Sequence, residues 1–484
     1  MPQSLKQQTA TGIKWSAIER FANQLMHFVV SVVLARLLAP STFGLVSMVT
    51  IFIAISRVFV NSGFAQALVR KPDRTELDNC TAFYFNIVVG AVCYALLYVC
   101  APLIAKFYNE PLLTPITRLV GITVLINSLM VVQHALLTLK MDFKTISKAS
   151  VTASLLAGGI GVYLAWVGYG VWALVTMQLI GRFTNLILVW IFAGWRPKWM
   201  FSWESFRNLW GFGSKLLASS LIDTVYKNLR TLIIGKVYSA ADLGYYGKAA
   251  HYAATPSDSL TGIIQKVVYP VLCRLQADKA KLADVYRQFI KLTVFIVFPL
   301  MMGLAGVSHS FIIVLLGEKW AFSGELLMIC CFSHMLYPVH AINLNPLQAL
   351  GRSDLFLRLE IVKKLVGLAI LAVTVPFGVK MIAVGAVVSS VLALFINTYY
   401  TDGLIGVSIW VQLKDIAPTF FLSFAMFGCI MLFNYLVDNL YLELLGGVVV
   451  GMIIYFAGAL LFRFKELYEL KDIVIKNILH QSNG

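Results

Sequence analysis

The sequence predicts an all-α polytopic membrane protein with about fourteen transmembrane helices. Of its 484 residues, 59% are hydrophobic and only 13% are charged. A soluble globular protein averages about 45–50% apolar and about 25% charged residues. The apolar residues form runs along the whole chain, and each run has about the 20 residues that a helix needs to cross the hydrocarbon core. A soluble domain with one membrane anchor is therefore excluded.

Glycine, proline and charged residues interrupt the apolar runs and mark the predicted boundaries. The least regular stretches are 245–272 and 322–349, where prolines intervene. The predicted spans are 13–37, 43–66, 79–104, 113–139, 149–167, 171–193, 211–235, 245–272, 286–311, 322–349, 357–376, 381–401, 416–436 and 442–462.

Basic residues are distributed unevenly between alternate loops. If the N-terminus is cytoplasmic, most of the 39 Lys and Arg residues fall in inside loops, as the positive-inside rule requires. The outside loops then hold only Arg36, Lys106, Arg118, Lys236, Lys248, Lys319 and Lys380. Because a missed span in mid-chain would remove this asymmetry, we expect fourteen spans with both termini in the cytoplasm.

Short motifs recur in the same order in the two halves of the chain. Gly44 in "LARLLAPSTFGLVSM" matches Gly244 in "IGKVYSAADLGYYGK", and Asp142 in "ALLTLKMDF" matches Asp354 in "PLQALGRSDL". Each match marks the same kind of element, a turn between two spans. Helices 1–6 and 7–12 therefore look like two copies, and an even number of helices gives both copies the same orientation.

The repeat divides the chain into three predicted regions. Residues 1–208 form an N-terminal six-helix lobe with a Trp-rich interfacial linker, and residues 209–403 form a C-terminal six-helix lobe. Residues 404–484 hold helices 13 and 14 and a cytoplasmic tail. We expect the two lobes to surround a central cavity.

Other chemistry is largely absent from the sequence. The 7 cysteines are odd in number and include no C-x-x-C, which favours packing roles over a disulfide framework or a metal site. No P-loop, G-x-S-x-G, H-E-x-x-H or dinucleotide motif occurs. We therefore expect no cofactor, no metal and no enzymatic activity. The charge of +16 follows from the cytoplasmic loops and does not predict nucleic-acid binding.

Charged residues also occur inside the predicted spans, where each costs about 2.5–3.5 kcal/mol at the bilayer centre. The basic ones are Arg20, Arg57, Arg182, Lys215, Lys227, Arg230 and Lys266, and the acidic ones are Glu19, Asp223 and Asp258. Local ion pairs could hold helices together, and Arg182 and Lys215 could extend to the membrane surface. Pairing alone leaves a positive excess.

This excess predicts a water-filled cavity that binds an anion. In "DTVYKNLR", Asp223, Lys227 and Arg230 share one helical face by their spacing. The predicted substrate-binding residues are Arg20, Gln24, His27, Arg57, Asp223, Lys227, Arg230 and Lys266. Glu19, Asp223 and Asp258 are candidates for ion coupling, and the spacing does not distinguish among them. For His27, a packing or hydrogen-bonding role is favoured over proton transfer.

Three stretches carry a resemblance to a known family. "GIKWSAIERF", "LARLLAPSTFGLVSM" and "NSGFAQALVRK" resemble the polysaccharide transporter branch, or Wzx-type flippases, of the multidrug/oligosaccharidyl-lipid/polysaccharide exporter (MOP) superfamily. The resemblance implies alternating-access movement of an undecaprenyl-diphosphate-linked oligosaccharide across the bacterial inner membrane, for synthesis of surface polysaccharide such as lipopolysaccharide. Relatives that flip the peptidoglycan precursor have functional arginines in helices 1, 2 and 8. Arg20, Arg57 and Lys266 are the nearest matches, and Lys266 differs in type.

Two rival functions remain open at this point. A cation-drug antiporter of the same superfamily would require an acidic or aromatic cavity, which the basic excess disfavours. A membrane polysaccharide polymerase or glycosyltransferase would require a long external loop with catalytic carboxylates, and the predicted outside loops are short. The expected partners are the lipid-linked oligosaccharide, membrane lipids and the polysaccharide polymerase machinery, with no nucleic acid.

Overall fold

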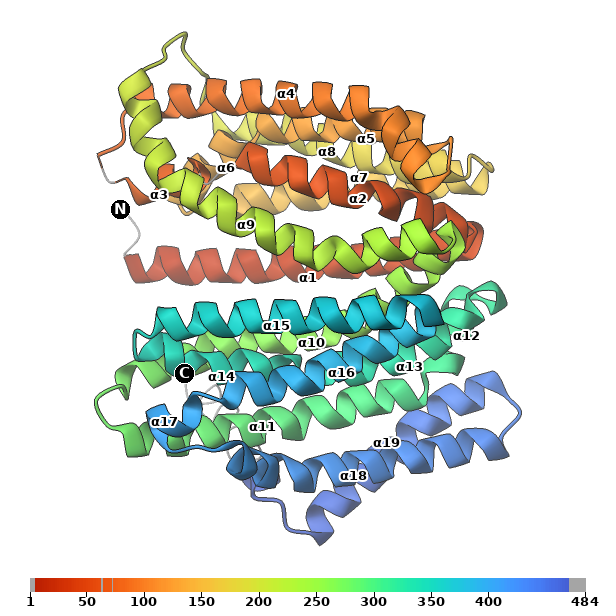
Figure 1. The fold of residues 1–484 in the computed structure, drawn as a ribbon. Helices are drawn as coiled ribbons and strands as arrows, with labels where there is room; N and C mark the ends of the chain where they lie inside the picture. Colours follow the sequence, from red (N-terminus) through yellow and green to blue (C-terminus); the bar gives the residue numbers. More distant parts are fainter. Residues whose placement is uncertain (1–4, 62–63, 72, 470–484) are drawn as a thin grey trace. The chain divides into compact units, whose positions relative to one another are not determined.

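The described part of the chain is almost entirely helical. The computed structural model describes residues 5–61, 64–71 and 73–469, without the side chains at 5–14, 16–21, 65, 70, 212 and 215. These residues form α-helices α1–α19 and two short 3-10 helices, with no β-strand among them (Figure 1). The predicted all-α class is confirmed.

Two compact units make up the chain, residues 1–244 and residues 245–484. The predicted regions 1–208, 209–403 and 404–484 were defined by the sequence repeat and not by compact packing. That division stays a prediction. Helix α10 (Ala240–Arg274) begins at the end of the first unit and continues into the second. The two units are described separately below.

The first unit is a bundle in which α7 packs against α1 and α8, and α5 packs against α2, α4 and α8. Helix α9 packs against α2 and α4. The helices are α1 (Leu5–Leu37), α2 (Pro40–Asn61), α3 (Phe64–Arg70), α4 (Glu76–Tyr108), α5 (Leu113–Ser128), α6 (Val131–Leu139), α7 (Phe143–Trp166), α8 (Val171–Ala193) and α9 (Trp203–Val237).

The second unit has α11 near its centre, packed against α13, α14 and α18, while α18 also packs against α19. Its helices are α11 (Lys279–Gly306), α12 (Ser308–Leu316), α13 (Ala321–Met335), α14 (Tyr337–Ala349), α15 (Ser353–Thr374), α16 (Val379–Thr398), α17 (Thr401–Ile405), α18 (Ile409–Leu436) and α19 (Leu440–Leu461). The 3-10 helices are η1 (Glu318–Trp320) and η2 (Val375–Phe377).

Several helices begin at a side-chain cap. The Thr75 side chain accepts from the Asp78 backbone N–H and the Asp78 carboxylate accepts from the Thr75 N–H, which is a complete capping box at the start of α4. Asp142 caps α7 in the same way by accepting from the N–H of Thr145. These caps satisfy backbone donors that the first helical turn leaves unpaired.

The repeat is visible in the backbone of the two units. In each one a long helix is broken, at Leu129–Met130 between α5 and α6 and at Leu336 between α13 and α14. The helices that follow also pack alike, because α7 pairs with α8 and α15 pairs with α16. Three pairs of positive-φ residues occupy matching turns: Asn109 and Gly317, Met141 and Gly351, and Gly170 and Gly378.

One detail of the predicted alignment differs. Asp142 is the N-cap of α7, whereas Asp354 lies in the first turn of α15, where Arg352 is the N-cap. The matching left-handed residues, Met141 and Gly351, set the register of this turn. Within the first unit, Gly44 and Gly244 each allow the other's helix to approach closely. A Cβ on Gly44 would overlap the Ala240 backbone, and a Cβ on Gly244 would overlap the Pro40 backbone.

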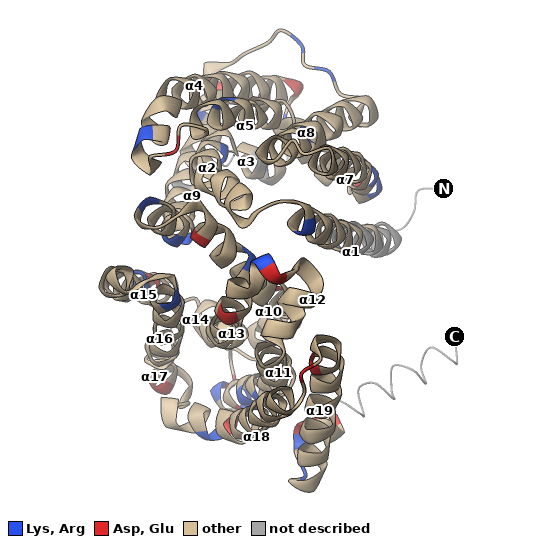
Figure 2. Cartoon of the chain, turned by 90° about the vertical axis from the view of Figure 1, so that its right-hand side faces the viewer, with Lys and Arg blue, Asp and Glu red and all other residues tan. Residues whose placement is uncertain are grey.

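Ten helical segments in the described chain are long and apolar enough to cross a membrane, and Ala22–Leu37 is a shorter apolar helix. The chain is therefore a multi-pass membrane protein. The helices at the other predicted spans, α1, α9, α10 and α15, are present but more polar. Figure 2 shows that charged residues occupy short patches on the helices. The count of fourteen spans and the cytoplasmic location of both termini stay predictions.

Candidate functional site

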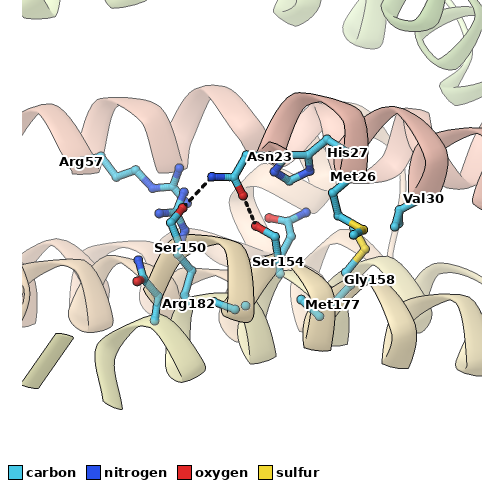
Figure 3. A pocket seen from close by; sticks show the side chains of 15 residues that line it. Asn23, Met26, His27, Val30, Arg57, Ser150, Ser154, Gly158, Met177 and Arg182 are labelled. Carbon is cyan, nitrogen blue, oxygen red and sulfur yellow. Dashed lines mark hydrogen bonds between the residues drawn. The ribbon is translucent and has the colours of Figure 1, made fainter. Parts of the chain in front are cut away.

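The first unit encloses a polar pocket of about 400 Å³ between α1, α2, α7 and α8 (Figure 3). This volume lies within the range of roughly 300–1,000 Å³ that is usual for ligand pockets. The lining residues are Asn23, Met26, His27, Val30, Arg57, Ser150, Ala153, Ser154, Ala157, Gly158, Met177, Gln178, Gly181, Arg182 and Asn185. We call it the cationic pocket.

Small and hydroxylated residues hold α1 and α7 together along one wall. The Asn23 amide donates to the Ser150 hydroxyl at 2.9 Å and accepts from the Ser154 hydroxyl at 2.9 Å (Figure 3). On the same helix, Gly158 lies against Val30, where a Cβ would come within 2.6 Å of a Val30 methyl. The amide and the two hydroxyls therefore satisfy one another while keeping α1 close to α7.

Two arginines supply the charge of the pocket. Arg57 comes from α2, where one guanidinium nitrogen contacts the Thr123 hydroxyl at 3.4 Å and the buried Nε has no hydrogen-bond partner among the described atoms. Arg182 comes from α8, one turn before Asn185, whose buried Oδ1 likewise lacks a described partner. An unsatisfied buried donor on a cation is costly, and an acceptor in the pocket would remove that cost.

Arg182 lies close to other basic side chains. Its guanidinium acts electrostatically on Arg57, on His27 and on His134 of α6. None of the fifteen lining residues carries a carboxylate. Like charges repel more strongly away from bulk water, so an anion bound between the two arginines would be favoured. The arrangement can bind and release an anion, and among its described side chains no metal-binding group of His, Cys, Asp and Glu occurs.

The structure brings together only part of the predicted site. His27 and Arg57 line the cationic pocket. Asp223 and Lys227 of α9 form the expected i,i+4 ion pair at 2.8 Å, with side chains that are 45% and 71% exposed. Arg230 is half-buried on the same helix, and Gln24 is exposed on α1 outside the pocket lining. In the second unit, Asp258 and Lys266 are exposed on α10. The side chains of Glu19 and Arg20 lie outside the described residues.

Arg182 is the main site residue that sequence reasoning missed. By sequence it is one of the basic residues inside the spans that could extend to the membrane surface, and it is not among the predicted substrate-binding residues, whereas it lines the cationic pocket. A signal was available, because Gln178, Arg182 and Asn185 follow one another at i, i+4 and i+7 in an otherwise apolar helix. That spacing places three polar residues on one helical face.

The sequence of the chain matches a known protein family. The family described as Polysaccharide biosynthesis protein matches residues 33–324, which is more than half of the sequence. The chain belongs to this family. Its members with similar sequences include the teichuronic acid biosynthesis protein TuaB of Bacillus subtilis, which is 25% identical over 87% of this chain and 88% of TuaB. The predicted family resemblance is confirmed.

Two further relatives of this polysaccharide biosynthesis protein match over most of their length. The lipopolysaccharide biosynthesis protein WzxC of Escherichia coli is 26% identical over 87% of this chain and 88% of WzxC. The succinoglycan biosynthesis transport protein ExoT of Rhizobium meliloti is 22% identical over 98% of this chain and 97% of ExoT.

Solved structures share the fold of this polysaccharide biosynthesis protein. The lipid II flippase MurJ, in an inward closed conformation, matches with a TM-score of 0.76 over 94% of this chain and all of MurJ, at 14% identity. A multidrug resistance MATE family transporter of the MOP superfamily matches with a TM-score of 0.60 over 82% of this chain and 95% of that protein, at 13% identity. The fold is therefore the one found in MOP superfamily transporters.

Proposed function

We propose that this protein is a flippase that moves an anionic lipid-linked oligosaccharide, of the undecaprenyl-diphosphate type, across the bacterial inner membrane by alternating access. The observation that carries the proposal is the cationic pocket, in which Arg57 and Arg182 lie within electrostatic reach of each other and no described lining residue is a carboxylate. A diphosphate is an anion that must cross about 30 Å of hydrocarbon. Charge-assisted contacts to two guanidinium groups would replace the water it loses.

The remaining predicted residues fit a route for the diphosphate. Arg20 and Arg57 receive it nearer the cytoplasm, and Lys227 and Arg230 of α9 receive it in the outer half of the membrane. Asp223 holds Lys227 in an ion pair, which lowers the net charge at that point. A purely cationic route would bind its cargo too tightly to release it, so a compensated lysine favours turnover. Lys266 is the remaining basic contact of the route.

The relatives support the class of substrate. TuaB, WzxC and ExoT are described as teichuronic acid, lipopolysaccharide and succinoglycan biosynthesis proteins, and all of these products are surface or secreted polysaccharides. The flippase activity requires no cofactor and no catalytic group on the chain, since only binding and release are needed. We place both termini in the cytoplasm. We assign the coupling of transport to an ion to one of Glu19, Asp223 and Asp258. The polysaccharide polymerase machinery is the proposed partner that consumes the transported product.

An antiporter of cationic drugs is the rival that the fold allows, because a MATE family transporter shares it. The cationic pocket disfavours that function. A cation would enter a site with two arginines and no carboxylate among its described lining residues, and like charges at a few ångströms are strongly repulsive where water is scarce. A positively charged drug therefore has no favourable contact there.

The proposal is tested in a strain that lacks its own copy of the gene and carries this chain with Arg57→Gln, Arg182→Gln or both. Each substitution keeps a polar side chain that can donate hydrogen bonds but removes the charge. We expect surface polysaccharide to be lost and lipid-linked oligosaccharide to accumulate on the cytoplasmic face, at normal protein abundance. Arg118→Gln is the matched control, because Arg118 stacks on Tyr98 at 4.2 Å outside the pocket. Normal polysaccharide in the double variant would contradict the proposal.

A further inference from the structure

A second pocket in the first unit has a different chemistry from the cationic pocket. It has a volume of about 600 Å³ and lies between the ends of α2 and α5 and the short helices α3 and α6. Its polar lining residues are Asn61, Gln66, Asn127, His134 and Thr138, and the others are apolar, including Met130. None of these described lining residues is Lys, Arg, Asp or Glu. We call it the amide pocket.

The break between α5 and α6 shapes this pocket. Asn127 lies in the last turn of α5, His134 lies in the first turns of α6, and Met130 is buried between them. The Asn127 amide donates to the Asn61 Oδ1 at 3.2 Å, which leaves the Asn61 nitrogen and the Asn127 oxygen to face a ligand. Gln66 is exposed on α3, and the Thr138 hydroxyl donates to the His134 carbonyl at 2.8 Å.

Helix α2 lines both pockets, with Arg57 in the cationic pocket and Asn61 in the amide pocket one helical turn later. Arg57 of α2 contacts Thr123 of α5, and four residues later Asn61 of α2 contacts Asn127 of α5. Four residues correspond to about 6 Å along a helix. His134, which lines the amide pocket, also lies within the electrostatic reach of Arg182 in the cationic pocket. One ligand could therefore occupy both pockets through adjacent chemical groups.

The chemistry of the amide pocket fits a neutral group with many hydroxyls. A side-chain amide both donates and accepts hydrogen bonds, as a sugar hydroxyl does, whereas a phosphate only accepts and is favoured by cations. The apolar lining, including Met130, suits the C–H faces of a pyranose ring. A bare prenyl chain would cover the amides of Asn61, Gln66 and Asn127 without offering them a hydrogen-bond partner.

We propose that the amide pocket is the subsite for the first sugar of the oligosaccharide, the one joined directly to the diphosphate. The inference rests on the proposed function, since the diphosphate must lie in the cationic pocket next to it. Asn61 lies one helical turn beyond Arg57. With the diphosphate at Arg57, the sugar on its second phosphate would therefore lie next to Asn61 and Gln66. The amide pocket then determines which sugar is accepted, while the cationic pocket binds any lipid diphosphate.

The test measures equilibrium binding to the purified full-length protein in detergent. The probes are farnesyl diphosphate and farnesyl diphosphate that carries one glucose, galactose or N-acetylglucosamine. We expect wild type to bind at least one sugar-bearing probe more tightly than farnesyl diphosphate. Gln66→Leu should weaken that probe about two- to tenfold, the loss expected for one neutral hydrogen bond, and leave farnesyl diphosphate binding unchanged. Arg57→Gln should weaken every probe.

Gln66 is suited to the test because it is exposed, so its replacement should not disturb folding. Gln348→Leu, at an exposed glutamine on α14 in the second unit, is the matched control and should bind like wild type. If Gln66→Leu weakens farnesyl diphosphate as much as the sugar-bearing probes, or if wild type binds all four probes equally, the sugar subsite is wrong while the proposed function stands. If wild type binds no diphosphate probe, both are wrong.

Discussion

The cationic pocket of the first unit and the ion-paired residues of the second unit differ in how their charges are compensated. In the first unit, Arg57 and Arg182 line a pocket without a carboxylate among its lining residues. In the second, Asp415 of α18 binds Arg287 of α11 at 2.7 and 2.9 Å, and it also binds Lys291 at 3.1 Å.

Other cations of the second unit are paired in the same way. Lys363 and Glu360 form an ion pair on α15, and Lys380 pairs with Glu325 of α13. Charges that are compensated within the protein stabilise the packing of helices, whereas charges that are left uncompensated need a ligand. The two units share a helix order, so the difference lies in the side chains and not in the fold. We therefore propose that the anion binds in the first unit.

The largest expected effect comes from the cationic pocket. Replacing Arg182 with Gln should reduce polysaccharide export at least tenfold, because a lost charge-assisted contact to phosphate costs about 1.5–3 kcal/mol. Replacing it with Lys should retain part of the activity, since the charge remains and the bidentate geometry is lost. Export is measured as surface polysaccharide per molecule of inserted protein. If Arg182→Gln exports polysaccharide at the wild-type level, the cationic pocket does not bind the transported anion and this difference between the two units is contradicted.

The second unit should respond in the opposite way. Asp415 is 6% exposed, so Asp415→Asn leaves two cations without their shared partner and should lower stability by about 2–3 kcal/mol. The expected result is lower protein abundance and a lower melting temperature in detergent, with normal export per molecule that remains. A stable protein with no export would mean that this acid takes part in transport.

Helix α9 tests the outer part of the proposed route. Arg230→Ala should abolish export at normal abundance, and Arg230→Lys should retain part of it. The Asp223–Lys227 pair is half exposed or more, so its contribution to stability is at most about 1 kcal/mol. If Arg230→Ala lowers abundance and a Lys227→Met, Asp223→Leu double variant exports normally, these charges only hold helices together.

The smallest effect concerns a turn outside the predicted spans. The Arg352 guanidinium, bound at 2.9–3.0 Å, lowers the pKa of Asp354 to about 2, and both groups are exposed. A carboxyl with a lowered pKa stabilises the fold above its unfolded pKa, and this contribution is lost as the pH falls towards 2. Melting temperatures of wild type and Asp354→Asn should therefore differ slightly at pH 6 and converge near pH 2. A difference that grows on acidification would contradict this assignment.

Much of the architecture follows from the sequence. Apolar runs of membrane-spanning length predicted an all-helical, multi-pass protein, and Gly44 and Gly244 marked equivalent turns because only glycine permits the close backbone approach found there. Helices α1, α9, α10 and α15 were also predicted, and their polarity is what separates them from the ten apolar segments.

The candidate site was only partly predictable. Spacing on a single helix placed Asp223 next to Lys227, since residues at i and i+4 are neighbours whatever the rest of the fold does. It did not bring Arg57 of α2 together with Arg182 of α8, because contacts between helices depend on which faces pack. Pro338 marks the break at Leu336, but the break at Leu129–Met130 carries no strong sequence signal, and the amide pocket depends on it.

The most direct test of the central claim is a translocation measurement in proteoliposomes that contain only this protein. A lipid diphosphate that carries one sugar is placed in both leaflets, and the fraction accessible to an added, membrane-impermeant glycosidase is followed over time. We predict that wild type and Arg118→Gln expose nearly all of the lipid, whereas the Arg57→Gln, Arg182→Gln double variant exposes only the outer-leaflet half. Equal exposure by the double variant and wild type would contradict the claim that the cationic pocket carries the diphosphate.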